Sequence, residues 1–146
     1  MTDLIFEYRK QAGASPHRLV VLLYEQLIQD LHRAIAAIEE NNIERRTNEL
    51  GHALEVVGEL QARLDAERGG VVSANLDRYY NVLRNCLLKA QFVRSQEILR
   101  GQIGHLVSLR EAWLEVERAA SAAANANPTK VVQEAAAGSA TADWKA

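Results

Sequence analysis

The sequence predicts an all-α protein: an antiparallel up-down-up-down four-helix bundle with a short N-terminal cap segment and a flexible, Ala-rich C-terminal tail. Apolar residues recur at spacings of three and four along four stretches of roughly 20–25 residues, the pattern of amphipathic helices. The 146 residues include only 8 Gly and 2 Pro, and 5% are aromatic, whereas a sheet protein needs more turn and aromatic residues. Four helices joined by short connections pack as antiparallel neighbours.

The first long helix is predicted from Ser15 and Pro16 to about Glu40. The Ser15 hydroxyl can accept a hydrogen bond from a free N–H of the first turn, and Pro16 suits the first helical position, where no N–H is needed. The asparagine pair 41–42 ends this helix. The preceding residues 1–14 are too few for a stable isolated helix and too apolar for a solvated tail, so we expect them to dock as a cap segment.

The second helix is predicted over residues 43–67, and the glycine pair 69–70 ends it. Glycine adopts the left-handed conformation that is common just past helix ends. The third helix begins between Val71 and Ser73 and fades near residues 91–93.

The fourth helix is capped by Ser95. Gly101 and Gly104 lie inside its apolar pattern, where each either weakens the helix by about 1 kcal/mol relative to Ala or permits another backbone to approach closely. The composition then shifts to Ala, Ser and Asn. We therefore predict a bundle domain over residues 15–118 and a low-complexity tail over residues 119–146.

The composition argues against several classes of function. Lys plus Arg is 17 and Asp plus Glu is 19, a formal net charge of −2, whereas a dedicated nucleic-acid binder is strongly basic. No apolar run approaches the roughly 18–20 residues that span a bilayer. The N-terminus lacks the basic region of a signal peptide, so we expect a cytoplasmic protein without direct membrane insertion. The single cysteine excludes an internal disulfide and a Cys-based metal cluster.

No residue pattern indicates an enzyme, and no cofactor or metal is expected. A di-iron bundle needs two Glu-x-x-His pairs. The chain has one, Glu49 to His52, and Leu50 on the core stripe turns Glu49 outward. Cys86 lies on or beside an apolar face, which is typical of a buried, inert thiol rather than a nucleophile. Stoichiometric metal in the purified protein would revive the metalloprotein alternative.

Apolar residues exceed what one core stripe needs. Residues 19–23 are five consecutive apolar side chains, which point around the whole helix at about 100° per residue. Similar doublets occur at 87–88, 98–99 and 106–107. Some apolar surface is therefore expected outside the core, covered either by residues 4–8 or by an amphipathic helix of a partner.

Three blocks, in this order along about residues 4–118, resemble the flagellin-specific export chaperone family, FliS. They are residues 14–20 (ASPHRLV) with 22–25 (LLYE), residues 64–70 (LDAERGG) through 75–80 (NLDRYY), and residues 109–113 (LREAW). The chain departs from the family pattern after Tyr8, where Arg-Lys replaces the usual Gln, and after Tyr24, where Glu-Gln replaces Asp-Gly.

The resemblance implies a cytoplasmic chaperone that binds the C-terminal segment of flagellin. That segment is disordered when free and folds into helices along the bundle, which blocks premature polymerisation. The resemblance further implies delivery to the flagellar type III export apparatus, where the chaperone–flagellin complex docks on the export-gate component FlhA. The alternative is a four-helix adaptor for an amphipathic helix of another secretion cargo or a regulator, and such a protein would not bind flagellin.

The resemblance also implies contact residues. Ile5 and Tyr8 would form a removable lid over a pocket that cargo also uses. Val20, Val21 and Tyr24 on the first long helix are candidates for contact with flagellin.

On the third helix, Tyr79, Tyr80 and Leu83 would line the core or a groove. Neighbouring residues point about 100° apart, so we expect one of the two tyrosines to face away from the core. Trp113 is interpreted as a core anchor.

Overall fold

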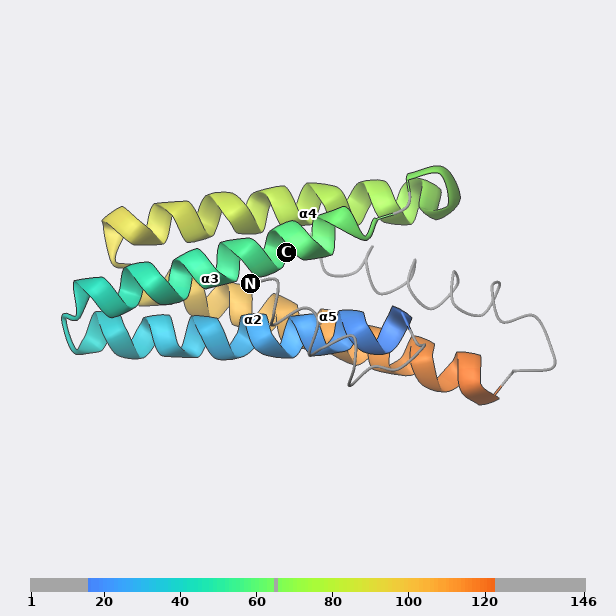
Figure 1. Ribbon diagram of the computed structural model, residues 1–146, viewed down its shortest axis with the longest axis horizontal. Coiled ribbons are helices and arrows are strands. Elements are labelled where there is room, and N and C mark those ends of the chain that lie inside the picture. Colours follow the sequence, from blue (N-terminus) through green and yellow to red (C-terminus); the bar gives the residue numbers. More distant parts are fainter. Residues whose placement is uncertain (1–15, 65, 123–146) are drawn as a thin grey trace.

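The computed structural model of the protein describes residues 16–64 and 66–122, which form four helices and, within those ranges, no strand (Figure 1). The helices are α2 (Pro16–Glu39), α3 (Ile43–Ala62), α4 (Ala66–Val93) and α5 (Gln96–Ala122).

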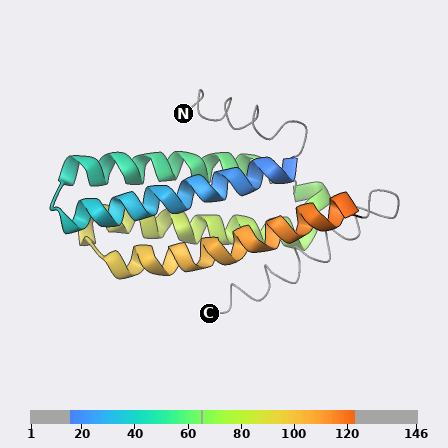
Figure 2. The ribbon, with the colours of Figure 1, turned by 90° about the horizontal axis from the view of Figure 1, so that it is seen from below.

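Consecutive helices run in opposite directions, as both views of the ribbon show (Figures 1 and 2). Contacts join α2 to α3, α3 to α4, α4 to α5, and α5 back to α2. This ring of antiparallel neighbours confirms the predicted up-down-up-down bundle. The predicted cap segment, residues 1–14, and the end of the predicted tail, residues 123–146, lie outside the described residues.

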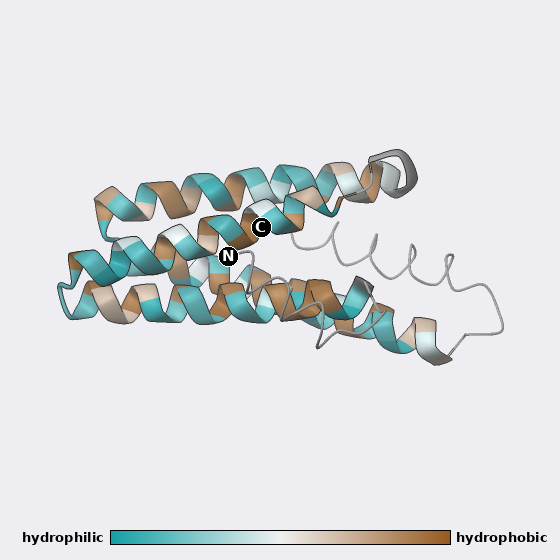
Figure 3. Ribbon diagram, viewed as in Figure 1, coloured by the Kyte–Doolittle hydropathy of each residue, from teal (hydrophilic) through white to brown (hydrophobic). Residues whose placement is uncertain are grey.

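Each helix contributes buried apolar residues to a shared core, and hydrophilic residues alternate with hydrophobic ones along every helix (Figure 3). The largest fully buried side chains come from all four helices: Tyr24, Tyr80, Leu23, Leu27, Leu31, Leu50, Leu60, Leu83, Leu87, Leu99, Leu106 and Leu109. Burying an aliphatic side chain of this size stabilises a fold by roughly 1.5–3 kcal/mol, so these leucines carry much of the stability of the bundle.

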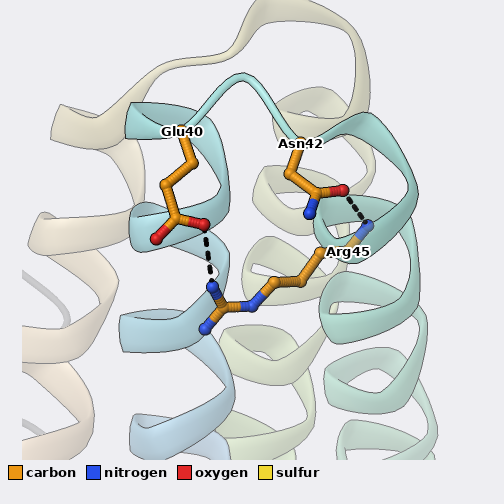
Figure 4. Close-up of polar contacts among 3 residues, drawn as sticks. All are labelled: Glu40, Asn42 and Arg45. Carbon is orange, nitrogen blue, oxygen red and sulfur yellow. Dashed lines mark hydrogen bonds and ion pairs between the residues drawn. The ribbon is translucent and has the colours of Figure 1, made fainter.

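The turn between α2 and α3 is closed by local polar contacts (Figure 4). Asn41 has a positive φ of 56°, which asparagine tolerates better than most residues. The side chain of Asn42 accepts a hydrogen bond from the Arg45 backbone N–H at 3.0 Å and so caps α3. The Arg45 guanidinium lies 3.1 Å from the Glu40 carboxylate, an exposed pair that contributes little. The asparagine pair therefore both ends one helix and starts the next.

The boundary between α3 and α4 differs from the prediction. Helix α3 ends at Ala62 rather than at residue 67, because the backbone N–H groups of Arg63 and Leu64 make tight bonds to carbonyls three residues back, each 3.2 Å long. The bounds of α4 begin at Ala66, because a short helical segment precedes Gly70. Gly70 has non-helical backbone angles, φ 53° and ψ −125°, so a kink separates a short helical segment from the long helix that follows. The predicted break at the glycine pair and the predicted start of the long helix between Val71 and Ser73 agree with this kink.

Glycine substitutions on α4 and α5 are expected to act in opposite directions. Gly70→Ala should lower the free energy of unfolding by about 1–3 kcal/mol, because a side chain is strained at this positive φ. Gly104→Ala should raise it by up to about 1 kcal/mol, because Gly104 is exposed within a helix and a Cβ there meets no atom within 4 Å. Urea unfolding of both variants checks the pair, and stabilisation by Gly70→Ala would contradict the kink.

Gly101 also has no neighbour within 4 Å of an added Cβ. The alternative that Gly101 and Gly104 permit close approach of another described backbone is therefore wrong. Both glycines lie on the exposed side of α5, where they are free of packing constraints.

The start of α5 matches the prediction. The Ser95 hydroxyl accepts a hydrogen bond from the Ile98 backbone N–H at 3.2 Å. The helix then continues to Ala122, so residues 119–122 of the predicted tail are helical. None of the helices within residues 16–64 and 66–122 has the length and apolar composition required to cross a membrane.

Candidate functional site

The structure places most predicted contact residues inside the bundle. Ile5 and Tyr8 lie outside the described residues, and Val20 is half-buried against the core. The other five predicted positions are buried: Val21, Tyr24, Tyr79, Tyr80 and Leu83. These five side chains therefore shape the core and do not line an open surface.

A chain of hydrogen bonds joins three helices in this core. The Tyr24 hydroxyl of α2 and the Tyr80 hydroxyl of α4 are 2.5 Å apart. The indole Nε1–H of Trp113, on α5, donates to the Tyr24 hydroxyl at 3.2 Å. Burial raises the pKa of Tyr24 to about 12, against the opposing effect of its bonds to Tyr80 and Trp113. Both hydroxyls stay protonated at neutral pH, so the chain is a structural contact, and it accords with the prediction of Trp113 as an anchor.

The two adjacent tyrosines of α4 are both buried, Tyr79 to 6% exposure and Tyr80 to 1%. The prediction that one of them faces away from the core is wrong. The Tyr79 hydroxyl donates to the Gln102 side chain of α5 at 3.0 Å, whereas Tyr80 extends toward α2. Because α4 is flanked by neighbours on two sides, its buried arc is wide enough to cover directions 100° apart.

Asp30 and His52 form a polar contact between α2 and α3. Asp30 is fully buried, and its Oδ2 lies 2.5 Å from Nδ1 of His52. The Gln26 amide donates to the other carboxylate oxygen at 2.7 Å. Burial raises the pKa of Asp30, although the contacts with His52 and Gln26 act in the opposite direction.

The pairing of Asp30 with His52 was not predicted, because the two residues are far apart in the sequence. Gln26 and Asp30, four residues apart within an apolar stretch of α2, were the available signal. Within residues 16–64 and 66–122, no group of three or more His, Cys, Asp or Glu side chains could hold a metal ion.

Cys86 is half-buried, and its Sγ lies 3.5 Å from the Gln102 side-chain amide. Burial raises the pKa of the thiol, and Lys89 only partly offsets this effect. The reactive thiolate is therefore disfavoured, as the prediction of an inert thiol requires.

An open groove of about 670 Å³ lies between the start of α2 and the end of α5. The His17 ring lies close by, 5.8 Å from the Trp113 ring, and burial lowers the pKa of His17. Charges of both signs and one large apolar side chain line this groove. The lining residues are Arg18, Leu114, Glu117, Arg118, Ser121 and Ala122.

The exposed apolar surface of the described residues lies mainly on α4. In the run 19–23, three side chains are buried and two are half-buried, so the surplus expected there is not exposed. In the doublet 87–88, by contrast, Leu87 is buried and Leu88 is exposed. The large apolar side chains that face outward are Ile43, Val71, Val82, Leu88, Phe92 and Val93.

Comparison with known proteins gives one consistent family. The family model described as "Flagellar protein FliS" matches residues 7–120. Flagellar secretion chaperone FliSB of Pseudomonas aeruginosa is 32% identical over 102 residues, which cover 70% of this chain and 81% of that protein.

Flagellar secretion chaperone FliS of Vibrio cholerae is 30% identical over 105 residues, or 72% of this chain and 77% of that protein. The protein of the same name from Salmonella typhimurium is 29% identical over 110 residues, or 75% and 82%. The matched residues include all four helices of the bundle almost completely, and the chain therefore belongs to the FliS family of flagellar secretion chaperones.

Proposed function

We propose that the protein is a cytoplasmic export chaperone for flagellin. It binds the disordered C-terminal segment of flagellin, prevents premature polymerisation and delivers the cargo to the flagellar type III export apparatus, where the complex docks on FlhA. The observation that carries this proposal is the family match over residues 7–120, together with relatives that are named flagellar secretion chaperones.

The physical character of the bundle supports a binding role. A disordered segment that folds on binding loses conformational entropy, which costs roughly 2–5 kcal/mol of the gross interaction energy. A preformed bundle limits that ordering cost to the cargo. The described polar contacts join helices to one another, as with Tyr24 and Tyr80, and hold the bundle together.

We further propose that residues 1–8 act as a removable lid through Ile5 and Tyr8. The groove is lined by Arg18, two residues after the start of α2 at Pro16, and by residues near the end of α5. Of the described contact candidates, Val20 is half-buried and can meet cargo directly. The buried candidates reach cargo only if the bundle opens, so their role is to hold the shape of the surface above them.

The test is calorimetric titration of the full chain with a peptide from the last roughly 40–50 residues of the host's flagellin, a length sufficient for two or three helices. We expect one-to-one binding with a large negative heat-capacity change, because apolar burial is coupled to folding. A scrambled peptide of the same composition is the control. Without residues 1–8 the flagellin affinity should change while the bundle stays folded.

Absence of binding at micromolar concentrations would contradict the flagellin proposal and favour an adaptor for another amphipathic helix. Unfolding on removal of residues 1–8 would contradict the lid alone.

A further inference from the structure

The carboxyl half of α4 differs in charge from the rest of the chain. Residues 78–96 contain no Asp or Glu, although the whole chain has 19 of them and a net charge of −2. The same stretch carries four cations: Arg78, Arg84, Lys89 and Arg94. Residues 78–96 are therefore basic, although the chain as a whole carries a small net negative charge.

Exposed apolar side chains accompany these cations. Phe92 is 86% exposed, and Val82, Leu88 and Val93 are 45–53% exposed. Exposing this much of a phenylalanine side chain to water is unfavourable. Several exposed apolar residues on one helix mark an interaction surface more often than a solvated one.

These residues share one face of α4. The positions 78, 82, 85, 89 and 92 are all exposed and follow alternating steps of four and three, the spacing of a seam along which a second helix packs. Leu88 and Val93 flank this seam, since each is one turn from a seam residue. We call this set the α4 seam.

Contacts on the α3 side hold the α4 seam in place. Near one end, the Gln61 amide donates to Asp77 at 3.2 Å and to Asn81 at 3.0 Å, and Arg84 donates to the Gln61 side-chain oxygen. These contacts also engage Asp77, the carboxylate that precedes the basic stretch.

Near the other end, the Arg46 guanidinium donates to the Gln91 carbonyl at 2.9 Å. The surface is therefore preorganised, which reduces the entropic cost of docking. Arg78, Lys89 and Arg94 make no ion pair with any side chain in the described part of the chain, so their charges are available to a partner.

From this geometry we infer that the α4 seam docks an amphipathic helix of a protein partner whose polar residues are acidic. The apolar side chains would bury against the apolar stripe of the incoming helix, and its carboxylates would flank Arg78 and Lys89, while Arg94 adds positive charge just beyond the end of α4. A nucleic acid would neutralise the cations but leave Phe92 and the valines uncovered. The inference does not rest on the proposed function, because it specifies the chemistry of the partner and not flagellin.

The probe is a synthetic helical peptide of about 20 residues with a leucine stripe and glutamates on its polar face. A second peptide carries lysine in place of each glutamate. Fluorescence anisotropy at low salt should show that the full chain binds the glutamate peptide at least about tenfold more tightly than the lysine peptide. Equal affinity for the two peptides would overturn the inference.

Variants of α4 locate the binding. Phe92→Ser should weaken binding of the glutamate peptide by about tenfold or more, as loss of a buried aromatic anchor does. Lys89→Glu should abolish the preference for glutamate over lysine. Val71→Ser is the matched control, because Val71 is 75% exposed on the same helix but outside residues 78–96, and it should change nothing. Equal effects of Phe92→Ser and Val71→Ser would overturn the inference.

Two further probes decide the class of partner. Vesicles rich in anionic lipid and duplex DNA should each bind more weakly than the glutamate peptide at physiological salt, and tighter binding of either would overturn the assignment to a protein helix. Flagellin titration is independent: if the flagellin peptide binds and the glutamate peptide does not, this inference fails and the proposed function stands.

Discussion

Tyr80→Ala is expected to lower the free energy of unfolding by about 3–5 kcal/mol, the usual range for truncating a buried aromatic residue. Tyr80 is fully buried at the centre of the bundle, and its hydroxyl contacts Tyr24, which in turn accepts a bond from Trp113. The substitution therefore removes core volume and leaves the Tyr24 hydroxyl without one of its partners. Urea unfolding followed by circular dichroism measures the loss.

Two matched variants separate the causes. Tyr80→Phe keeps the ring and should lose only about 1 kcal/mol, because one buried hydrogen bond is removed. Tyr79→Ala should also cost several kcal/mol, since Tyr79 packs between α4 and α5 and donates to Gln102. A loss below about 1 kcal/mol for Tyr79→Ala would contradict the burial of both tyrosines and restore the expectation drawn from helix geometry alone.

In the wild type, the free energy of unfolding should fall as the pH rises and Asp30 ionises, and Asp30→Asn is expected to remove this fall. Burial raises the pKa of Asp30 above its ordinary value of 3.8, so the folded state holds this proton more tightly than the unfolded chain does. The stability contributed by the protonated carboxyl is complete below pH 3.8 and is lost as the pH rises through the raised pKa. Above that range, the buried carboxylate depends on His52 and Gln26.

The measurement is the free energy of unfolding of the wild type and Asp30→Asn at a series of pH values from about 3 to 7. The advantage of the variant should grow as the pH rises from 3.8 and then level off. Asp77→Asn, at an exposed aspartate on α4, controls for the loss of one negative charge. Parallel curves for the wild type and Asp30→Asn would show that burial does not raise the pKa of Asp30.

Asp30→Ala tests the same contact by removal. It removes the carboxylate that contacts the Gln26 amide and His52 and should cost about 1–3 kcal/mol. His52 is 31% exposed, so water compensates part of this loss. A neutral outcome would show that the contact between α2 and α3 contributes nothing to stability.

Helix number, helix order and the caps could be predicted from the sequence because these features depend on residues a few positions apart. The period of three and four residues marks each amphipathic stripe. Ser95 caps α5 through a bond to Ile98, only three positions away. The end of α3 at Ala62 could not be predicted, because no Gly or Pro stands there and Leu64 continues the apolar stripe.

The candidate site was predictable mainly through resemblance to a family. Tyr24, predicted to contact flagellin, and Leu83, predicted to line the core or a groove, are both fully buried, so a contact role for either remains a proposal. Exposure of Leu88 beside buried Leu87 agrees with the expected apolar surplus, but the run 19–23, chosen on the same reasoning, is covered. The apolar pattern of a sequence gives the number of apolar residues on a helix. It does not say how much of the surface of that helix the neighbouring helices bury.

Residue periodicity and capping chemistry were thus sufficient for the class of fold, since they act within one helix. The burial of both tyrosines, the pairing of Asp30 with His52 and the exposure of the apolar residues in the α4 seam were decided only by tertiary packing. The first two depend on contacts between side chains from distant parts of the chain, as between Tyr24, Tyr80 and Trp113. The third depends on which helix face no other described helix covers.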